Sequence, residues 1–387
     1  MTKHLILVGT RKGAWIVEGN EQRSEWTVKG PMHLGAVVSH YVADPRTSGY
    51  QLMSVGSGHL GPSVFISRDT GATWTEAQKP PAFAAVPGAK TDTGSDAPAR
   101  SVDHVFWLTP GHASEPNVWY AGTSPQGLFK SLDGGDTWQE VEGFNHHPDC
   151  LQWRGGDKDG TPDGPKLHSV IVDHSDKKHL LIAMSGGGIF ESSDEGATWK
   201  PLNKGVAMDF YPPREDGSEY EFGHDPHCLV MHPVHANRLY HQNHCGLYAL
   251  DRSKGERWQR IGDNLPKEVG DIGFPIVLHP RDPDTAWVFP MDGSGQWPRT
   301  CPGGKPAVFR TRDGGASFER QNQGFPQSQA WWTVKRQCMA VDNEKAVGVY
   351  VGTTGGQLWV SKDEGAHWEA ITVDLPQIYS VEVVTQP

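Results

Sequence analysis

Short apolar runs separated by glycine-rich turns recur along the whole chain. Val118–Ala121 and Leu180–Ala183 are each followed by a turn and then by a second short run, Gly127–Lys130 or Gly188–Glu191. Runs this short, rich in β-branched and aromatic residues and bounded by glycine, are typical of strands rather than helices. The pattern therefore predicts an all-β chain built from antiparallel hairpins.

A polar motif, Ser-x-Asp-x-Gly-x-Thr-Trp, follows these paired runs. Clear copies are Ser67–Trp74, Ser131–Trp138 and Ser192–Trp199, and weaker copies are Thr311–Phe318 and Ser361–Trp368. In such a motif the Asp side chain binds nearby backbone N–H groups and the Gly accepts a positive φ, so each copy predicts a tight turn. The aromatic residue begins the next strand and can bury a large apolar area.

The spacing of the motif predicts the architecture. Degenerate copies at Asp251–Trp258 and around Trp26 complete a series of aromatic markers at residues 26, 74, 138, 199, 258, 318 and 368. Their separation of roughly 50 to 60 residues fits one four-stranded propeller blade with its loops. We therefore expect a single seven-bladed β-propeller, with blades over residues 1–30 with 376–387, 31–80, 98–142, 164–203, 225–262, 270–322 and 330–371.

The two ends of the sequence are expected to share one blade. The run Tyr379–Val384 has no strand after it to pair with, and Leu5–Val8 has no inner strand before it. Pairing the two runs would complete a blade and leave few open sheet edges.

The motif resembles the Asp-box, or bacterial neuraminidase, repeat, and the resemblance covers nearly the whole chain. Such repeats occur in sialidases, xyloglucanase-type glycosidases, sortilin-type receptors and a photosystem assembly factor. The segment Gly9–Trp15 is also similar to the opening of bacterial proteins described as sialidase-like. The resemblance implies a propeller whose boxes lie on the outer hairpins and bind no substrate, so a functional site must be sought elsewhere.

Composition narrows the choice of partners. The formal net charge of −11 disfavours nucleic acid and anionic membrane surfaces. No apolar run approaches the roughly 18 residues of a membrane span, and Met1–Val8 is interpreted as a strand rather than a signal peptide. Five scattered cysteines predict reduced thiols. We expect a cytoplasmic protein with a small-molecule substrate, and the sequence leaves its oligomeric state open.

Long insertions and histidines point to a site at one mouth of the central channel. Segments 80–100, 145–165 and 205–226 are expected on one face, where long loops on a rigid scaffold favour a substrate pocket. Aligned by their exit turns, the inner strands place these residues at one level: Ser39, His104, His168, His227, Phe274, Gln337 and Tyr379. Turns at the same mouth add His59 and His244.

Several neutral imidazoles in one channel are typical ligands of a divalent transition metal such as Zn, Mn or Fe. We expect His104, His168 and His227 to hold the ion and His244 and His59 to complete its shell, with Asp103, Asp225 and Asn243 as partners of the ring N–H groups. Histidines that merely fill the channel with hydrogen bonds are the alternative.

These residues favour metal-assisted hydrolysis or elimination on a small polar or anionic substrate. The candidate catalytic residues are His244, Arg11, Arg336 and Glu221. The candidate substrate-binding residues are Arg214, Tyr220, Gln242, Asn243, Gln337 and Tyr379. Arg11, Arg214 and Arg336 are expected to converge on a substrate carboxylate.

Two other classes of function remain open. One is a glycoside hydrolase that uses paired loop carboxylates, with Asp209, Glu219 and Glu221 as candidates. The resemblance to sialidases implies an Arg triad with an Arg-Ile-Pro motif, which Gly9–Gly13 lacks, and xyloglucanase-type enzymes pair two propellers where one is predicted here. The other class is a non-catalytic propeller, with Tyr220, Phe222 and Trp331–Trp332 forming a surface for a protein or another ligand.

Overall fold

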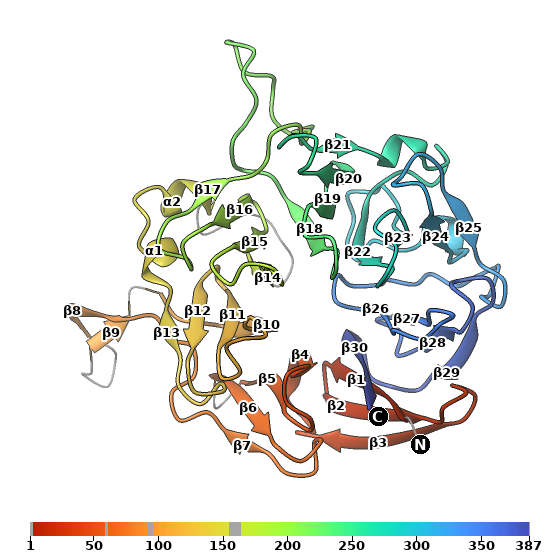
Figure 1. Cartoon of the computed structure of the whole chain (residues 1–387), viewed down its shortest axis with the longest axis horizontal. Coiled ribbons are helices and arrows are strands. Elements are labelled where there is room, and N and C mark those ends of the chain that lie inside the picture. Colours follow the sequence, from red (N-terminus) through yellow and green to blue (C-terminus); the bar gives the residue numbers. More distant parts are fainter. Residues whose placement is uncertain (1–2, 59–60, 91–95, 99, 155–163, 387) are drawn as a thin grey trace.

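The predicted hairpins form seven four-stranded antiparallel sheets in the computed structural model, which describes residues 3–58, 61–90, 96–98, 100–154 and 164–386. The sheets stand around a central axis as the blades of a propeller (Figure 1). The expected all-β, seven-bladed fold is thus confirmed.

The strands of each blade follow one another in sequence from the axis to the rim. The first such blade consists of β4 (Val37–Ala43), β5 (Gln51–Ser57), β6 (Gly61–Ser67) and β7 (Thr75–Glu76), and the second of β10 (His104–Pro110), β11 (Trp119–Ser124), β12 (Leu128–Ser131) and β13 (Gln139–Glu140). The third consists of β14 (Leu167–Val172), β15 (Leu180–Met184), β16 (Gly188–Ser192) and β17 (Lys200–Pro201). The fourth consists of β18 (Pro226–Met231), β19 (Arg238–Asn243), β20 (Gly246–Asp251) and β21 (Gln259–Arg260). Two more consist of β22 (Gly273–Leu278), β23 (Ala286–Pro290), β24 (Val308–Thr311) and β25 (Glu319–Gln321), and of β26 (Met339–Val341), β27 (Val349–Gly352), β28 (Leu358–Ser361) and β29 (Glu369–Thr372).

The seventh blade joins the two ends of the sequence. Its strand order is β3 (Trp26–Met32), β2 (Gly13–Gly19), β1 (Lys3–Thr10) and β30 (Ile378–Gln386), with β30 next to the axis. β1 and β30 pair antiparallel, with Leu7 opposite Glu382. The predicted closure of the ring by the first and last strands is confirmed.

Few elements lie outside the blades. β8 (Ala85–Lys90) and β9 (Asp96–Pro98) form a separate hairpin, and the short helices are α1 (Glu142–Asn145), α2 (Cys150–Trp153) and the 3₁₀ turns η1 (Gly262–Asn264) and η2 (Pro302–Gly304). Among the described residues, no helix has the length and apolar character needed to cross a bilayer.

The Asp-box motif makes the same hydrogen bonds in each clear copy. In Ser131–Trp138, Asp133 accepts bonds from the hydroxyl groups of Ser131 and Thr137, at 2.8 and 2.6 Å, and from the Thr137 N–H at 2.9 Å. Gly135 has φ +97°, and its carbonyl oxygen accepts a hydrogen bond from the indole N–H of Trp138 at 2.8 Å. A side chain on Gly135 would meet Leu52 of the preceding blade, so the turn also packs one blade against the next.

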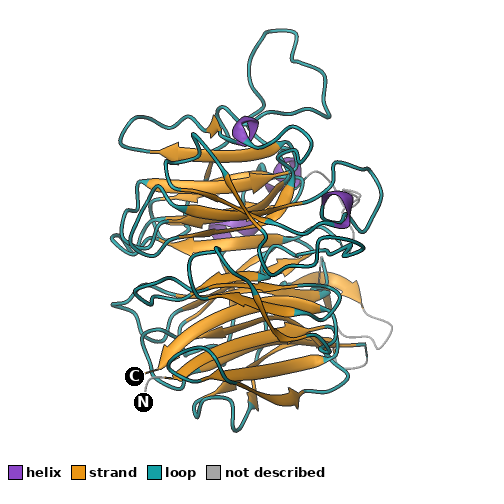
Figure 2. Ribbon diagram, turned by 90° about the vertical axis from the view of Figure 1, so that its right-hand side faces the viewer, coloured by secondary structure: helices purple, strands orange, loops and turns teal. Residues whose placement is uncertain are grey.

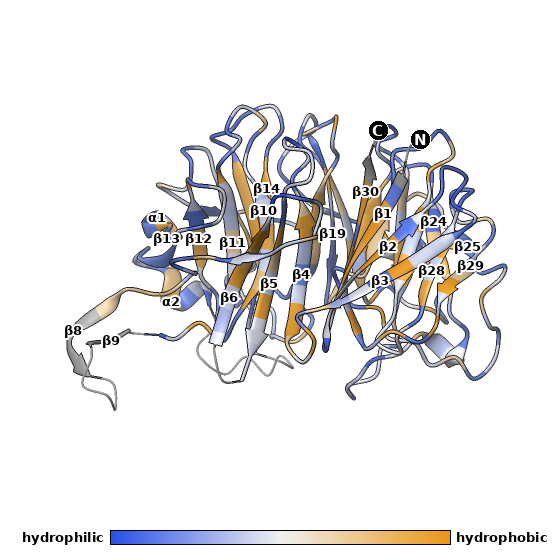
Figure 3. Ribbon diagram, turned by 90° about the horizontal axis from the view of Figure 1, so that it is seen from below, coloured by the Kyte–Doolittle hydropathy of each residue, from blue (hydrophilic) through white to orange (hydrophobic). Residues whose placement is uncertain are grey.

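The hydrophobic core lies between neighbouring blades. One cluster joins Tyr120 and Leu128 of one blade to Leu180 and Phe190 of the next. The strand centres are accordingly apolar and the turns polar (Figure 3). Each blade therefore depends on its neighbours for burial, which makes the ring a rigid support for its loops.

Antiparallel pairing decides which loops share a face. The start of an inner strand, the turn between the second and third strands, and the loop from the preceding blade all lie at the same end of a blade. Loops accordingly gather on the two faces of the disc, with the strands between them (Figure 2).

Candidate functional site

Three polar side chains meet where the blade of β18–β21 begins. Asp225 directly precedes β18, His227 lies in β18, and His244 lies in the turn between β19 and β20. One ligand atom from each side chain lies within 4.8 Å of the other two. We call these three residues the mouth cluster, because all three lie at the end of the blade where its inner strand starts and where its second and third strands are joined.

Asp225 is the centre of the mouth cluster. Its Oδ2 lies 3.5 Å from Nε2 of His227 and 3.6 Å from Nδ1 of His244. Its Oδ1 accepts the N–H of Gly186 at 3.3 Å, and its main-chain carbonyl accepts the N–H of His244 at 2.9 Å. The carboxylate is therefore fixed with one oxygen turned toward both imidazoles.

A main-chain carbonyl orients the His227 ring. Nδ1 of His227 lies 2.6 Å from the carbonyl oxygen of Gly273, and a carbonyl can only accept, so Nδ1 carries the proton. The other nitrogen, Nε2, then faces Asp225. His227 is nearly fully buried, whereas the His244 side chain is 36% exposed. The cluster is thus anchored inside the ring and open on the side of His244.

The protonation of the cluster follows from burial and charge. Burial acting alone would raise the pKa of Asp225, but the neighbouring imidazoles of His227 and His244 hold that pKa well below its ordinary value. Burial lowers the pKa of His227, and the Asp225 carboxylate opposes this shift only in part. The carboxylate is therefore ionised at neutral pH and the buried ring is neutral.

His168 and His104, two other histidines of the predicted metal site, do not join this cluster. His168 is fully buried, with Nε2 3.0 Å from the Pro226 carbonyl and Nδ1 2.9 Å from the hydroxyl of Ser169, so both of its nitrogens are used within the protein. The ring of His104 lies beside Phe106, with centroids 6.0 Å apart. His59 falls outside the described residues.

Strand bulges explain why the predicted row of histidines breaks up. The pairing register shifts between Val105 and Trp107 in β10, between His168 and Ile171 in β14, and between Pro226 and Cys228 in β18. The bulge therefore follows His104 and His168 but contains His227. Because a shift of one residue turns a side chain to the other face, equal sequence spacing does not give an equal direction.

The three predicted arginines lie in different elements and two of them have different contacts. Arg214 lies 3.6 Å from Asp216 and covers the ring of Tyr220, in a loop that projects from the rim of the ring (Figure 1). Arg336 lies over Phe106 near the axis, with a nitrogen 3.4 Å from Oγ of Ser185. Arg11 is exposed in the turn after β1. Arg214 and Arg336 therefore do not share one carboxylate site.

The remaining predicted binding residues have mainly structural contacts. Gln242 donates to the carbonyls of Asp271, at 2.7 Å, and Gly246. The side chain of Asn243 accepts the Cys245 N–H at 2.9 Å, and Gln337 donates to the Phe106 carbonyl at 3.0 Å. The ring of Tyr379 lies under the ammonium group of Lys335, 4.0 Å from the ring centroid. These contacts hold the turns around the mouth in place.

A row of aromatic rings crosses the mouth cluster. Consecutive ring centroids lie 4.6 to 5.7 Å apart along Tyr220, Tyr211, Phe210, His244, His227, Phe274 and Trp297. Phe210, Tyr211 and Trp297 are about half exposed. The row runs from the projecting loop across β18 to the loop after β23. The sequence signal for this row is the presence of aromatic residues in two long loops. Trp332, one residue of the predicted aromatic pair, is instead buried in the core.

The projecting loop carries the predicted carboxylates. Its two limbs touch where Met208 lies beside Gly223 and again where the Tyr220 hydroxyl donates to the Pro212 carbonyl at 2.8 Å. Asp209 and Glu221 lie on opposite limbs between these contacts, and both are exposed.

Glu219 differs from these two carboxylates, because it binds the guanidinium of Arg257 through both of its oxygens, at 2.5 and 2.9 Å. Asp209 and Glu221 are therefore the loop carboxylates best placed to meet a ligand.

Comparison with known proteins points to enzymes that act on xyloglucan. The chain is 23% identical over 332 residues to a probable oligoxyloglucan-reducing end-specific xyloglucanase of Neosartorya fischeri, covering 79% of this chain and 35% of that protein. It is 24% identical over 283 residues to a xyloglucanase of Acetivibrio thermocellus, covering 66% of this chain and 28% of that protein. The chain thus spans about a third of the length of these relatives. No protein-family model matches it.

Solved structures agree on the fold. The GH74 xyloglucanase from Xanthomonas campestris superposes with a TM-score of 0.62 at 16% identity, over 98% of this chain and 52% of that one. The GH74 enzyme of Niastella koreensis superposes with a TM-score of 0.53 at 15% identity, over 99% of this chain and 67% of that one. The likeness shows a shared propeller architecture.

These comparisons correct the predicted reaction. Metal-assisted hydrolysis or elimination on a small polar or anionic substrate is wrong as the main reading, because the relatives in sequence are named for action on a polysaccharide. The three histidines aligned in the sequence, His104, His168 and His227, do not meet in one site. The alternative of a glycoside hydrolase with loop carboxylates agrees better with the relatives.

Proposed function

We propose that this propeller is a glycoside hydrolase that binds a polysaccharide of the xyloglucan type along the aromatic row. The observation that carries the proposal is the row itself, with three half-exposed rings placed on either side of the mouth cluster. The xyloglucanases among the relatives in sequence support the choice of substrate.

The row fits an extended ligand. Aromatic rings offer flat apolar surfaces on which the C–H faces of sugars can pack, and polar groups beside them can bind the hydroxyl groups. Phe210 and Trp297 lie on opposite sides of the mouth cluster, on a path of rings that runs through His244, His227 and the buried Phe274. A path of several rings suits a chain of sugars better than a single small molecule.

Hydrolysis of a glycosidic bond needs two carboxyl groups on either side of it. Asp209 and Glu221 are exposed on opposite limbs of the projecting loop, between its two limb contacts, and Asp209 directly precedes Phe210 of the aromatic row. Glu219 is held by Arg257 and takes no part. We therefore assign the acid and base roles to Asp209 and Glu221.

The test measures release of reducing ends from xyloglucan and, separately, binding of xyloglucan oligosaccharides by calorimetry. We expect Asp209→Asn and Glu221→Gln each to lower turnover by about 100-fold or more, because each removes one group of the acid–base pair, and to leave binding within a few fold. Asp216→Asn, in the same loop but outside the two limb contacts, is the matched control and should keep wild-type turnover.

Two outcomes would overturn parts of the proposal. Binding without turnover in the wild type would leave a glycan-binding propeller and remove the catalytic assignment. Neither binding nor turnover with xyloglucan or its oligosaccharides would overturn the substrate class itself.

A further inference from the structure

The mouth cluster joins three separate pieces of the chain. Asp225 ends the projecting loop, His227 belongs to the inner strand, and His244 belongs to a turn of the same blade. We propose that Asp225, His227 and His244 bind one divalent transition metal ion, such as Zn²⁺, Mn²⁺ or Fe²⁺, at the base of the projecting loop. The proposal goes beyond the proposed function and gives the ion no part in breaking the glycosidic bond.

The two distances from Asp225 match a coordination shell, and all three ligand atoms lie within 4.8 Å of one another. With bonds of about 2.0 to 2.2 Å, neighbouring ligand atoms around a tetrahedral ion lie roughly 3.4 Å apart. Oδ2 of Asp225 lies 3.5 Å from Nε2 of His227 and 3.6 Å from Nδ1 of His244. An ion can therefore enter without a large movement of the side chains.

The hydrogen bonds around the cluster supply an independent argument. Because Nδ1 of His227 donates to the Gly273 carbonyl, Nε2 is the ring nitrogen left to bind an ion. Nε2 lies 3.5 Å from Oδ2 of Asp225, which is longer than an ordinary hydrogen bond. A cation between the two atoms would bind both of them, and a carbonyl behind the ring is the usual support of a metal-binding histidine.

The second oxygen of the carboxylate is already used. Oδ1 of Asp225 accepts the N–H of Gly186, which leaves Oδ2 as the oxygen available to an ion. Three ligands of this kind leave at least one position open. The opening lies on the side of His244, whose side chain and that of Asp225 are partly exposed. Phe210 packs on His244 there, so the ion would fix the imidazole on which this ring of the aromatic row rests.

The experiment uses the full chain, dialysed against a chelator and then titrated separately with Zn²⁺, Mn²⁺ and Co²⁺, the last as a spectroscopic probe. We expect about one ion per chain by elemental analysis and a Co²⁺ absorption band of a site with nitrogen ligands. His244→Ala and Asp225→Asn should each weaken the binding by about 100-fold or more, since each removes a ligand. The matched control is His367→Ala, which breaks an exposed His–Asp pair at 3.3 Å elsewhere on the ring.

Thermal unfolding of each variant checks that the fold is retained. No uptake of any of the three ions by the wild type, or uptake that survives in both His244→Ala and Asp225→Asn, would overturn the metal site. Binding of xyloglucan oligosaccharides to the chelator-treated protein is measured in parallel, so that failure of the metal site and failure of the proposed function can be told apart.

Discussion

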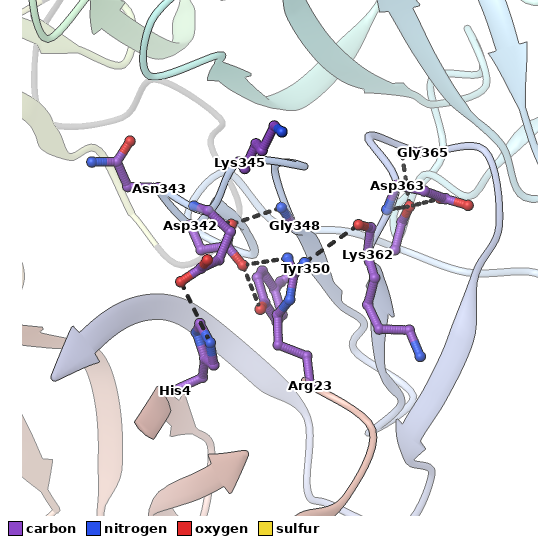
Figure 4. A network of polar contacts seen from close by, with 12 residues as sticks. His4, Arg23, Asp342, Asn343, Lys345, Gly348, Tyr350, Lys362, Asp363 and Gly365 are labelled. Atoms are coloured by element: carbon purple, nitrogen blue, oxygen red, sulfur yellow. Dashed lines mark hydrogen bonds and ion pairs between the residues drawn. The ribbon is translucent and has the colours of Figure 1, made fainter. Parts of the chain in front are cut away.

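Arg23 and Asp342 form a buried ion pair across two blades although they stand 319 positions apart in the sequence. Nη1 of Arg23, in the turn before β3, lies 2.8 Å from Oδ2 of Asp342, which follows β26 (Figure 4). The same carboxylate accepts the Tyr350 hydroxyl at 2.9 Å and the Gly348 N–H at 2.7 Å. The pair therefore ties the blade that closes the ring to its neighbour.

The first prediction concerns the stability of this junction. Replacing Arg23 by Met keeps the apolar stem but leaves the Asp342 carboxylate, whose side chain is fully buried, without its cation. Removing one partner of a buried pair is expected to lower the free energy of unfolding by about 3 kcal/mol. Urea denaturation followed by tryptophan fluorescence measures the change.

The exposed pair between Lys29 and Glu18, in the same closing blade, supplies the comparison. Lys29→Met should cost less than about 1 kcal/mol, because water screens that pair. Equal costs for the two substitutions would show that burial does not strengthen the Arg23–Asp342 contact.

The second prediction concerns the acid behaviour of the boxes. Hydrogen bonds from Thr73, and then from Ser67, hold the pKa of Asp69 at about 2, below its ordinary 3.8. A pKa lowered by folding stabilises the protein above the ordinary value, and this stabilisation is lost as the pH falls from about 4 toward 2. Thr73→Val should raise the pKa of Asp69 toward 3.8 in an NMR titration of the carboxyl carbon. An unchanged pKa would mean that Thr73 is not the main cause.

The third prediction concerns Glu382 in the inner strand β30. Burial raises the pKa of Glu382 from 4.5 to about 7. The folded state therefore holds this proton more tightly than the unfolded state, so the stabilisation is complete below pH 4.5 and is lost as the pH rises to about 7. Glu382→Gln should remove this loss. Its free energy of unfolding should therefore exceed that of the wild type by up to about 3 kcal/mol as the pH rises between those limits. Denaturation curves are measured for both proteins across this range. A difference in free energy of unfolding between Glu382→Gln and the wild type that stays constant with pH would contradict the prediction.

The fourth prediction concerns the parts of the aromatic row on the two sides of the mouth cluster. Trp297→Ala and Phe210→Ala should each weaken binding of a long xyloglucan oligosaccharide by about tenfold, because each removes an exposed ring without opening the core. Trp331→Ala, which removes another exposed ring outside the row, should leave the affinity unchanged. Calorimetry with oligosaccharides of two lengths checks the path, since a ligand too short to span the row should lose affinity in only one of the two variants.

The repeated boxes made the fold predictable. Asp133, Gly135 and Trp138 make contacts within their own turn, so their spacing alone indicates the local structure. The last strand could be placed because the run Tyr379–Val384 needs a partner, and β30 provides it by pairing with β1.

The site was less predictable, because direction in a strand depends on bulges that the spacing does not reveal. Between Pro226 and Cys228 the register slips, and His227 turns to Asp225 and His244, while His168 points to Pro226. The sequence indicates Asp225 only as a partner of ring N–H groups. Its central place depends on Gly186 and on a long loop, neither of which leaves a periodic signal.

The pairing of β1 with β30 has a consequence for synthesis. The ribosome makes β1, β2 and β3 before the other six blades, and β30, residues 378–386, after them. Until β30 is made, the backbone groups on one side of β1 have no partner in the sheet, and an open edge of this kind invites pairing with another nascent chain. The blade that closes the ring is therefore begun before every other blade and completed after all of them.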